Sequence, residues 1–458
     1  MRFPLFFKTA AVGGVLLALQ SVSAIVSERE SRLHEAERSV ADSLASQQIL
    51  LGPAMLRQCD EIWSSVQGEG KERKTVVERR EFTLMAMPAT LDVSAKAEIE
   101  PRYRGIFKVN GYAMKATLAA RWPDATALEP KAEHAGGKLR CESPVMFVAV
   151  GDSRGIRNAS MRVGGVAMPV LPGTEHPSHP RGFHVVLPST TLNAVGDGGL
   201  QVEVLLDLVG TGDLAFAPVA DTTHVALSSD WPHPSFGGRF LPAQRQITEQ
   251  GFSADWQLNA LATSAPQDFL RGGGACGMQE RNDDAPVAQA TGRPGRCVET
   301  FGVAFMDPVS AYVLSDRATK YGLLFIALTF VGVGLVEVLR RLRVHPVQYL
   351  LVGSALVVFF LLLVSLTEHI AFAWAYLAAS AACTLLLTFY ASFVLRGMRA
   401  GAIFGAAIAA LYGSLYLLLQ MEQSALVLGA LLLFAVLAAV MVATRRVDWY
   451  ALMEQLRR

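Results

Sequence analysis

Hydrophobic positions fall into one apolar block near the start of the chain and five closely spaced blocks near its other end. A membrane-spanning helix needs about 20 mainly apolar residues, and six segments meet that length. They cover residues 4–26, 321–339, 347–366, 370–390, 400–419 and 424–443. Short polar gaps separate the last five, so the pattern predicts an N-terminal transmembrane helix and a C-terminal bundle of five transmembrane helices.

The stretch between these blocks follows another pattern, in which short runs of branched and aromatic residues are interrupted by turn residues. Typical runs are "VMFVAVGD", "LQVEVLLDLVG" and "FSADWQLNAL". Two further runs flank Asn110-Gly111, a dipeptide favoured in tight hairpins because both positions tolerate positive φ. Short strands with frequent turns and no βαβ rhythm predict antiparallel sheets, packed as a sandwich. The expected fold class is an α+β membrane protein with a large β-rich domain.

These patterns also predict the domain boundaries. A membrane anchor covers residues 1–26, and a juxtamembrane helix with a linker covers 27–56. The β-rich domain, as one body or two subdomains, covers 57–320. The five-helix bundle covers 321–443, and a tail covers 444–458.

The first apolar segment has two interpretations. Its basic start, its apolar core and the small residues of "SVSA" resemble a cleavable signal. Apolar residues continue beyond it at helical spacing, at Val26, Leu33, Val40 and Leu44, as expected of a helix that leaves the membrane uncut. We favour the retained anchor, and either interpretation gives the same topology for the rest of the chain.

Charge indicates the orientation. Only 18% of the residues are charged, compared with about 25% in soluble domains, and the mean hydropathy is +0.33. Arginines gather in alternate connections, at 340–343 and 396–399, and again at 445–458. Because basic connections stay in the cytoplasm, both termini are predicted to be cytoplasmic and the β-rich domain periplasmic. The net charge of +1 gives no indication of nucleic acid as a partner.

Four of the five cysteines lie in the predicted periplasmic domain, at Cys59, Cys141, Cys276 and Cys297. That compartment permits disulfides. Because Cys276 and Cys297 bracket a polar loop, we expect a bridge between them, with Cys59–Cys141 as the second choice. No CxxC occurs and no histidine lies at ligand spacing from these cysteines, so the pattern does not indicate zinc.

A search for catalytic chemistry finds no recognisable constellation. The chain has no G-x-S-x-G and no S-x-x-K motif, and "GTGDL" at 210–214 lacks the Lys-Ser/Thr of a phosphate loop. We interpret "GDSRG" at 151–155 as a strand followed by a Gly-Asp turn, with Arg154 facing solvent. An exposed Pro-rich loop, rather than a metal site, is the interpretation of His176, His179 and His184. We therefore expect no enzyme, no metal and no cofactor.

Two sets of residues are candidate functional positions. We interpret the stretch "SDWPHPSFGGRFLP" at 229–242 as a rigid structural corner, because Pro232 and Pro234 restrict the backbone. The alternative is an interaction surface made of Trp231, His233, Phe236 and Arg239. In the predicted bundle the candidate polar residues are Glu337, Glu368 and His369.

Several longer stretches, in order, resemble the CreD family of inner-membrane proteins of Gram-negative bacteria. They are "LLGPAM", "GDSRGI", "SSDWPHPSFGGRFLPAQRQITEQGFSADWQ", "LSDRATKYGLLFIALTF", "HPVQYLLVGSALVVFFLLLVSLTEH" and "TRRVDWY". The resemblance covers nearly the whole chain, although the region between Cys276 and Cys297 departs from it. It implies a cell envelope integrity protein associated with a two-component regulon and with the response to envelope stress and β-lactams. It implies no catalytic residue and no cofactor.

Two functional hypotheses result. The first is a non-enzymatic inner-membrane protein whose periplasmic domain binds or senses an envelope component, which is a protein, a lipid or a glycan. The alternative is a transporter or lipid-handling protein that works through the C-terminal helices, because a simple anchor needs only one helix. Apart from the lipid bilayer, the sequence identifies no partner, and it does not determine the oligomeric state.

Overall fold

The computed structural model describes residues 3–67, 74–188, 199–278, 297–305, 307, 311–340, 344–421 and 425–445. The chain divides into two compact units. The β unit consists of Glu35–Pro308, and the helical unit consists of Met1–His34 together with Val309–Arg458. The expected α+β class with a large β-rich domain is confirmed. Most of the predicted tail, from residue 446 onward, lies outside the described residues.

Both ends of the β unit differ from the predicted boundaries. Helix α1, Phe3–Ser43, is continuous, and strand β1, Gln48–Gln67, begins soon after it, so residues 48–56 are strand rather than linker. Helix α4, Ala311–Arg340, begins ahead of the predicted apolar span at 321. The helical continuation of α1 agrees with the predicted juxtamembrane helix, so the explanation is needed only for the early start of α4. Apolar residues mark the stretch that crosses a membrane, whereas a helix continues into water with its backbone still hydrogen-bonded.

The β unit contains two sheets. The first runs in the order β14 (Ser235–Gly238), β17 (Phe301–Ala304), β12 (Asp213–Phe216), β1, β6 (Val145–Ala149), β10 (Gly182–Val186) and β9 (Leu171–Pro172), with β2 (Lys74–Ala86) and β5 (Lys138–Cys141) also paired to β1. The second runs in the order β15 (Gln244–Thr248), β16 (Gly251–Asn259), β13 (Thr222–Ser229), β3 (Thr90–Arg104), β4 (Phe107–Trp122), β11 (Leu200–Thr211), β7 (Ile156–Val163) and β8 (Val166–Met168). Most neighbours are antiparallel, as predicted, but β1 pairs with β12 and β3 with β13 in parallel.

The hairpin predicted at Asn110-Gly111 is wrong. Strand β4 runs through both residues, and the reversal between β3 and β4 lies at Gly105, whose φ is +59°. At Gly111 a Cβ would lie 3.1 Å from the Glu100 carbonyl oxygen and 3.3 Å from Leu44. The glycine therefore permits a close approach to its neighbours, a use that the dipeptide alone does not distinguish from a turn.

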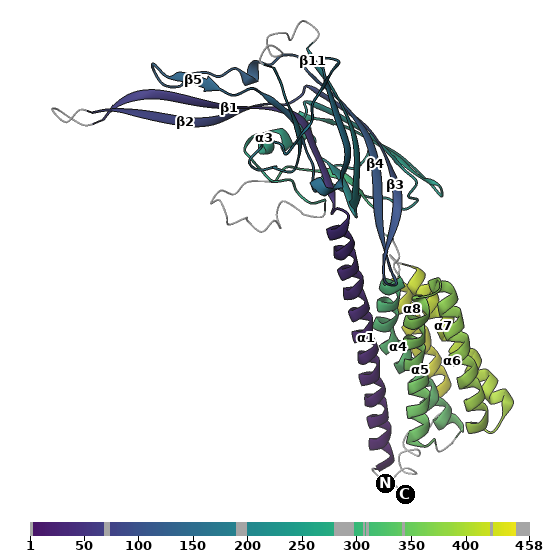
Figure 1. Ribbon diagram of the computed structural model, residues 1–458. Helices are drawn as coiled ribbons and strands as arrows, with labels where there is room; N and C mark the ends of the chain where they lie inside the picture. Colours follow the sequence, from purple (N-terminus) through teal and green to yellow (C-terminus); the bar gives the residue numbers. More distant parts are fainter. Residues whose placement is uncertain are drawn as a thin grey trace. The chain divides into compact units, whose positions relative to one another are not determined.

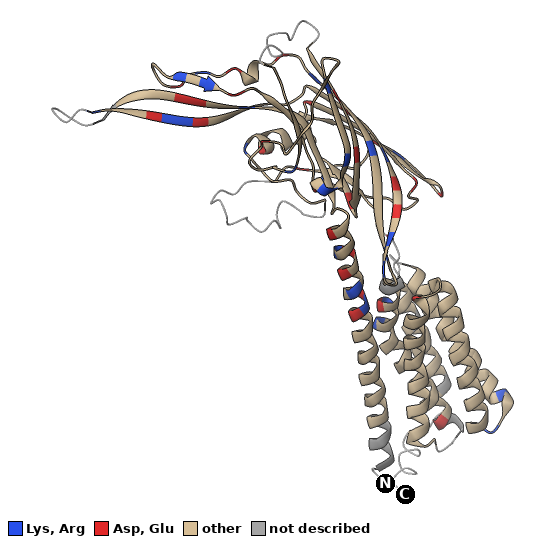
Figure 2. Ribbon diagram, in the orientation of Figure 1, with Lys and Arg blue, Asp and Glu red and all other residues tan. Residues whose placement is uncertain are grey.

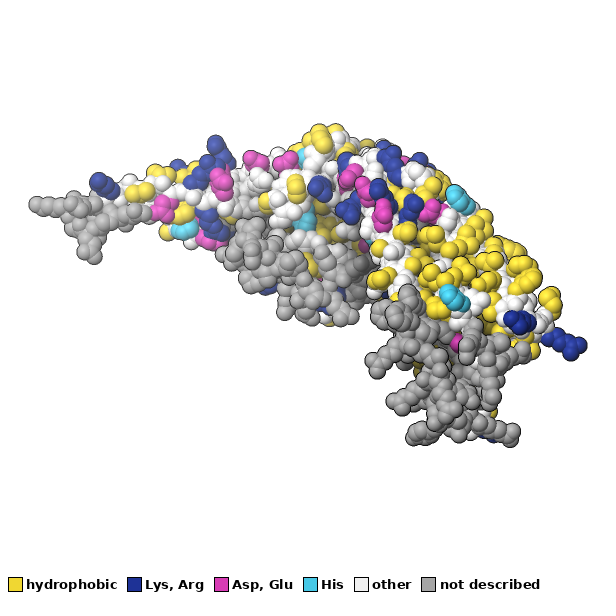
Figure 3. Space-filling model, turned by 90° about the horizontal axis from the view of Figure 1, so that it is seen from below, with side chains coloured by type: hydrophobic (Ala, Val, Ile, Leu, Met, Phe, Trp, Pro, Cys, Tyr) yellow, Lys and Arg dark blue, Asp and Glu magenta, His cyan; other side chains and the backbone are white. Residues whose placement is uncertain are grey.

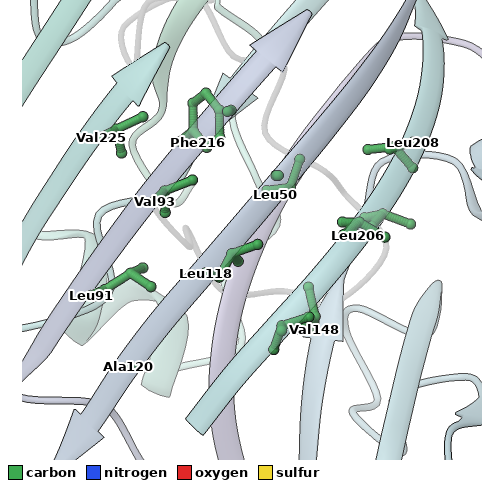
Figure 4. Packing of buried hydrophobic residues seen from close by; sticks show 14 of the residues in the cluster. Leu50, Leu91, Val93, Leu118, Ala120, Val148, Leu206, Leu208, Phe216 and Val225 are labelled. Carbon is green, nitrogen blue, oxygen red and sulfur yellow. The ribbon is translucent and has the colours of Figure 1, made fainter. Parts of the chain in front are cut away.

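The core of the β unit lies between the two sheets, where side chains from both converge (Figure 4). The first sheet contributes Leu50, Val148 and Phe216, and the second contributes Val93, Leu118, Leu206 and Val225. Buried and exposed positions alternate along most of β3, as expected of a strand with one face on a core and the other in solvent. This two-sheet packing is the sandwich that the alternating pattern predicted.

Strands β1 and β2 extend from the first sheet as a two-stranded arm (Figure 1). Their register pairs Met55 with Ala86 at the root of the arm and Gln67 with Lys74 at its far end. Since an isolated two-stranded ribbon is only marginally stable in water, the arm needs a brace. Strand β5 supplies it by pairing with β1 from Cys59 to Ile62. Charged side chains of both signs lie along the arm (Figure 2), which suits an element surrounded by solvent.

The helical unit combines the first part of α1 with α4, α5 (Pro346–Thr367), α6 (Phe372–Val394), α7 (Met398–Gln420) and α8 (Ala425–Thr444). Among the described residues, α1, α4, α5, α6 and α7 are long and apolar enough to cross a membrane. The apolar part of α8, Val427–Val442, is shorter. The predicted five spans after the β-rich domain are thus four plus a shorter apolar helix. Figure 3 shows hydrophobic side chains gathered over much of the helical surface.

Helix α1 is a packed member of the helical unit. Val15 and Leu19 are buried in its core. A Cβ added at Gly353 would lie 2.3 Å from Val15, and one added at Gly322 would lie 3.1 Å from Leu19. Glycines of this kind let helix backbones approach closely inside a membrane. The arrangement fits a retained anchor.

Candidate binding site

A groove of about 770 Å³ opens at the root of the arm. Strands β1, β2 and β5 line one side of it, and the loop of residues 173–181 lines the other. Its polar lining residues are Gln58, Asp60, Arg79, Glu81, Thr83, Arg140, Glu142, Thr174, Glu175 and His176. The volume is in the range of cavities that take a small molecule or a short piece of a larger one.

The groove presents both signs of charge. Arg79 forms ion pairs with Asp60 at 2.9 Å and with Glu81 at 3.1 Å, and hydrogen bonding to Asp60 raises the pKa of Arg79. Because Arg79 and Glu81 are exposed, water and salt screen these pairs and they contribute little to stability. Ligand groups of either sign therefore compete for them at little cost. Carboxylates are in excess, with Glu142 opposite the loop and Glu175 on it.

A disulfide fixes the groove side of the arm. Cys59 of β1 and Cys141 of β5 lie directly opposite each other in the antiparallel register, and their sulfurs are bonded. The second bridge joins Cys276 and Cys297. Both predicted disulfides are therefore present in the structure. Cys383 is a free, buried cysteine of α6, as the sequence indicates.

The loop of residues 173–181 corrects the prediction that its histidines are exposed. The His176 residue is only 3% exposed, and its ring stacks on Phe269 of the short helix α3, Ala265–Leu270, with ring centroids 5.1 Å apart. The His179 ring lies 5.3 Å from the same phenylalanine. Burial lowers the pKa of His176 to about 4, and it also lowers the pKa of His179. Residues 173–181 form a loop, as predicted, but the rings of His176 and His179 face a phenylalanine distant in sequence. His184 is buried in strand β10, so the exposed-loop interpretation is wrong for it.

A second groove, of about 350 Å³, lies on the other side of this loop. His179 and Pro180 contribute to its lining, together with Leu51 of β1 and Ala149 of β6. Pro180 lines both grooves. The loop is therefore a wall between two hollows, and any rearrangement of it changes both.

The "GDSRG" segment forms a socket for the end of α1. The Asp152 carboxylate accepts hydrogen bonds from the Ser46 backbone N–H at 3.0 Å and from Arg154 Nη2 at 2.6 Å. Arg154 Nη1 donates to the carbonyl oxygen of Asp42, in the last turn of α1. Hydrogen bonds from Arg154 hold the pKa of Asp152 well below its usual value. Arg154 is exposed, as predicted, and it is also engaged with the helix end, which the sequence did not predict.

Gln48 completes the socket from inside. Its side chain is fully buried, donates to the carbonyl oxygens of Asp152 and Val209, and accepts from the Asp152 N–H. Thr211 Oγ1 donates to the Ala45 carbonyl oxygen at 2.9 Å. The chain just after α1 is therefore fixed by side chains from three separate strands and loops of the β unit.

A family model for inner membrane protein CreD matches residues 4–450. The match includes the arm, the socket and the helices of the helical unit. The chain belongs to the CreD family. Inner membrane protein CreD of Escherichia coli (strain K12) is 35% identical over 459 residues, which cover 98% of this chain and 95% of that protein. This CreD-family chain is therefore an inner-membrane protein, and its resemblance to the family is confirmed.

One solved structure shows a limited likeness. An M1 zinc metallopeptidase from Deinococcus radiodurans is 9% identical, with coverage of 37% of this chain and 38% of that one and a TM-score of 0.20. A likeness this loose says nothing about the function of a CreD-family chain. Across the described ranges, no group of three or more His, Cys, Asp or Glu residues is placed to hold a metal ion.

The stretch that the sequence singled out at 229–242 packs mostly inward in this CreD-family protein. Trp231 is 8% exposed and donates from Nε1 to the His233 carbonyl oxygen at 2.8 Å. The Phe236 ring meets Trp256 edge-on at 5.7 Å. As members of an exposed surface, Trp231 and Phe236 are corrected to packing residues, which is the structural-corner interpretation. His233 and Arg239 are exposed, and their role in an interaction stays a prediction.

The candidate polar residues of the helical unit have partners at helix ends. Tyr349 donates to Glu337 at 2.5 Å, near the end of α4 and the start of α5. Glu368, which caps α5, pairs with Arg29 of α1 at 3.2 Å. His369 follows it and is exposed. The structure does not bring these three residues together into one site.

Sequence reasoning missed the groove itself. Its charged members come from β1, β2, β5 with the residue after it, and the loop, and each looks like an ordinary solvated position in its own stretch. They are Asp60, Arg79, Glu81, Arg140, Glu142 and Glu175. The one available signal was the pairing of Cys59 with Cys141, which brings β5 beside β1. That pairing, read together with strand alternation, would have placed Arg140 opposite Asp60.

Proposed function

We propose that this inner-membrane protein holds its β unit in the periplasm and uses the groove at the root of the arm to bind or sense an envelope component, without catalysing a reaction. The groove carries the proposal, because it is a polar hollow of ligand size between a braced arm and a loop. Two disulfides in the β unit agree with an oxidising compartment. The arginines of alternate connections support the same orientation.

The mixed charge of the groove favours a partner with both basic and acidic groups over a purely apolar one. Arg79, Arg140 and Glu142 are within its lining, together with backbone groups of the Pro-rich loop. A peptide or an amino-sugar polymer of the envelope has this chemistry. The exposed ion pairs leave these charges free to exchange partners, because water and salt screen them.

The transporter or lipid-handling alternative receives less support. Its candidate residues Glu337 and Glu368 lie at helix ends, where Tyr349 and Arg29 engage them. Ionisable residues that serve a transport path usually face a bundle interior or a water-filled cavity near the middle of the membrane. Pairing near the ends of helices is instead typical of structural roles at the membrane surface.

Photo-crosslinking in living cells tests the proposal. A photoreactive amino acid at Glu142, inside the groove, is expected to capture a discrete envelope protein, lipid or glycan. The matched control carries the same probe at Lys138, an exposed position outside the groove lining, at the start of the short strand that ends just before Glu142. Identical products from both positions, or no product from Glu142 in folded protein, would contradict a binding groove.

Filling the groove with a large side chain should reduce the capture of the partner by the probe at Glu142. The Thr83→Trp variant places a large ring at the lining of the groove, and we expect capture from Glu142 to fall about tenfold or more, equivalent to about 1.4 kcal/mol of binding free energy. The fall in capture is measured as the yield of cross-linked product from Glu142, normalised to the protein level. Full capture by a folded Thr83→Trp protein would place the partner elsewhere.

A further inference from the structure

The loop of residues 173–181 depends on a histidine that is neutral. Its turn is closed by Thr174, which donates to the His179 carbonyl oxygen and accepts from the His176 N–H. The Ser178 N–H donates to His176 Nδ1 at 3.2 Å. A nitrogen that accepts a hydrogen bond carries no proton, so protonation of Nδ1 would put two N–H groups face to face and break the closure.

The two histidines of the loop differ in this respect. His179 Nε2 lies 2.9 Å from the Gly273 carbonyl oxygen, to which it donates. A protonated His179 keeps that bond, so its proton costs only the burial of charge. A proton on His176 costs both the burial of charge and the bond from Ser178. His176 is therefore the residue through which acid acts on the loop.

Within the part of the chain that the structure describes, no carboxylate is ion-paired with the His176 ring. On its inner side the ring meets Phe269 of α3 and Phe147 of β6. His179 disfavours a charge on it, and no acidic group contributes to holding one. The other titratable and charged residues on the elements around it are Asp268 and Arg271 on α3, Glu175, His179 and Arg181 on the loop, His184 on β10, and Asp60, Arg79, Glu81, Arg140 and Glu142 across the groove. Asp268 is engaged by the Ser264 hydroxyl at 2.6 Å.

We propose that the loop of residues 173–181 is an acid-responsive wall, which a proton on His176 Nδ1 releases from α3 and so merges the two grooves. The proton comes from the solvent that fills the groove and returns to it when the pH rises. The proposal rests on the proposed function in one respect, the location of the β unit in the periplasm, where the pH changes with the pH outside the cell. The release itself needs no ligand.

The sign and size of the response follow from linkage. The pKa of His176 is about 4 with the loop closed and 6.5 for an unperturbed histidine, so the open loop binds the proton more tightly. The closed loop is fully favoured above the open-state pKa and loses its advantage as pH falls toward the closed-state pKa. With these values the ratio of open to closed loop rises about twenty-fold between pH 7 and pH 5.

Hydrogen–deuterium exchange of the full chain in detergent micelles tests this inference, with exchange corrected for the intrinsic effect of pH. The protection factor of amides within residues 174–181 is expected to fall about twenty-fold from pH 7 to pH 5. In His176→Asn the amide oxygen replaces Nδ1 as acceptor but does not titrate, so the loop should keep its protection in acid. His233→Asn, which changes an exposed histidine elsewhere in the β unit, should respond as the unchanged protein does.

Two results would overturn the acid-responsive wall. One is equal protection of the unchanged protein at both pH values. The other is the same loss in His176→Asn. If His176→Asn is unprotected even at pH 7, His176→Phe retains the ring on Phe269, and its protection should then be low but independent of pH. Capture from Glu142 is measured separately, so a groove without a partner and a loop without an acid response give different outcomes.

Discussion

The Asp152→Ala variant is expected to lower the free energy of unfolding of the β unit by about 3 kcal/mol. The Asp152 side chain is 7% exposed and receives hydrogen bonds from the Ser46 and Arg154 backbone N–H groups as well as from the Arg154 guanidinium. Each buried donor left without an acceptor costs about 1–3 kcal/mol. The expected loss in free energy of unfolding stays near the lower end of the summed range, because Arg154 is half exposed and its guanidinium can hydrogen-bond to water instead.

Urea unfolding of the full chain in detergent, followed by tryptophan fluorescence, measures the effect, because Trp122 and Trp256 are fully buried in the β unit. The control is Asp152→Asn, which keeps one acceptor oxygen and should cost clearly less. A loss below about 1 kcal/mol for Asp152→Ala would be within the range of an ordinary surface change. That result would contradict the socket.

The socket and the acid-responsive wall both lose stability in acid, because the structured state lowers the pKa of Asp152 and the pKa of His176. Arg154 depresses the pKa of Asp152 in the folded state, so the carboxylate contributes its full stability above the ordinary pKa of about 3.9 for aspartate. The contribution is lost as pH falls below that value. At pH 5 the socket is therefore intact while His176 already takes up protons, which separates the two effects experimentally.

The membrane helices and the sheets were predictable because each depends on a pattern within a short window. A run of about 20 apolar residues reports a span, and alternation reports a strand with one face on a core. Both disulfides were also predictable from compartment and spacing. The continuation of α1 beyond its apolar span was predicted from the helical spacing of later apolar residues. A run of apolar residues does not report where a helix begins in water, which is why α4 starts ahead of its predicted span.

The socket and the groove could not be predicted from the sequence, and the reason differs from that for the helix ends. Asp152 meets Ser46 across 106 residues of sequence, and Gln48 meets Val209 across 161. Neither local turn chemistry nor composition reports such partners. Likewise, the Pro-rich surroundings of His176 correctly indicate a loop, but its burial depends on Phe269 of α3. Loops of low hydrophobicity are exposed only when no distant element covers them.

Removing the arm disulfide is the second change with a large expected effect. In the chain-entropy model, a bridge between residues 82 apart, as Cys59 and Cys141 are, stabilises the fold by about 4.5 kcal/mol. The double variant Cys59→Ser with Cys141→Ser should lose much of that. The loss should be concentrated in the arm, because β5 is a four-residue strand and a ribbon of two strands is marginal by itself.

The measurement combines urea unfolding with hydrogen exchange of the arm. The matched control removes the other bridge, Cys276–Cys297, which spans 21 residues and is expected to cost about 1 kcal/mol less in the same model. Amides of β1 and β2 beyond Cys59 should lose protection in the first double variant and keep it in the second. Equal protection of the arm in both would mean that β5 pairing alone holds it. The groove would then be shaped by strand register, and its capture of a partner should survive reduction of the protein.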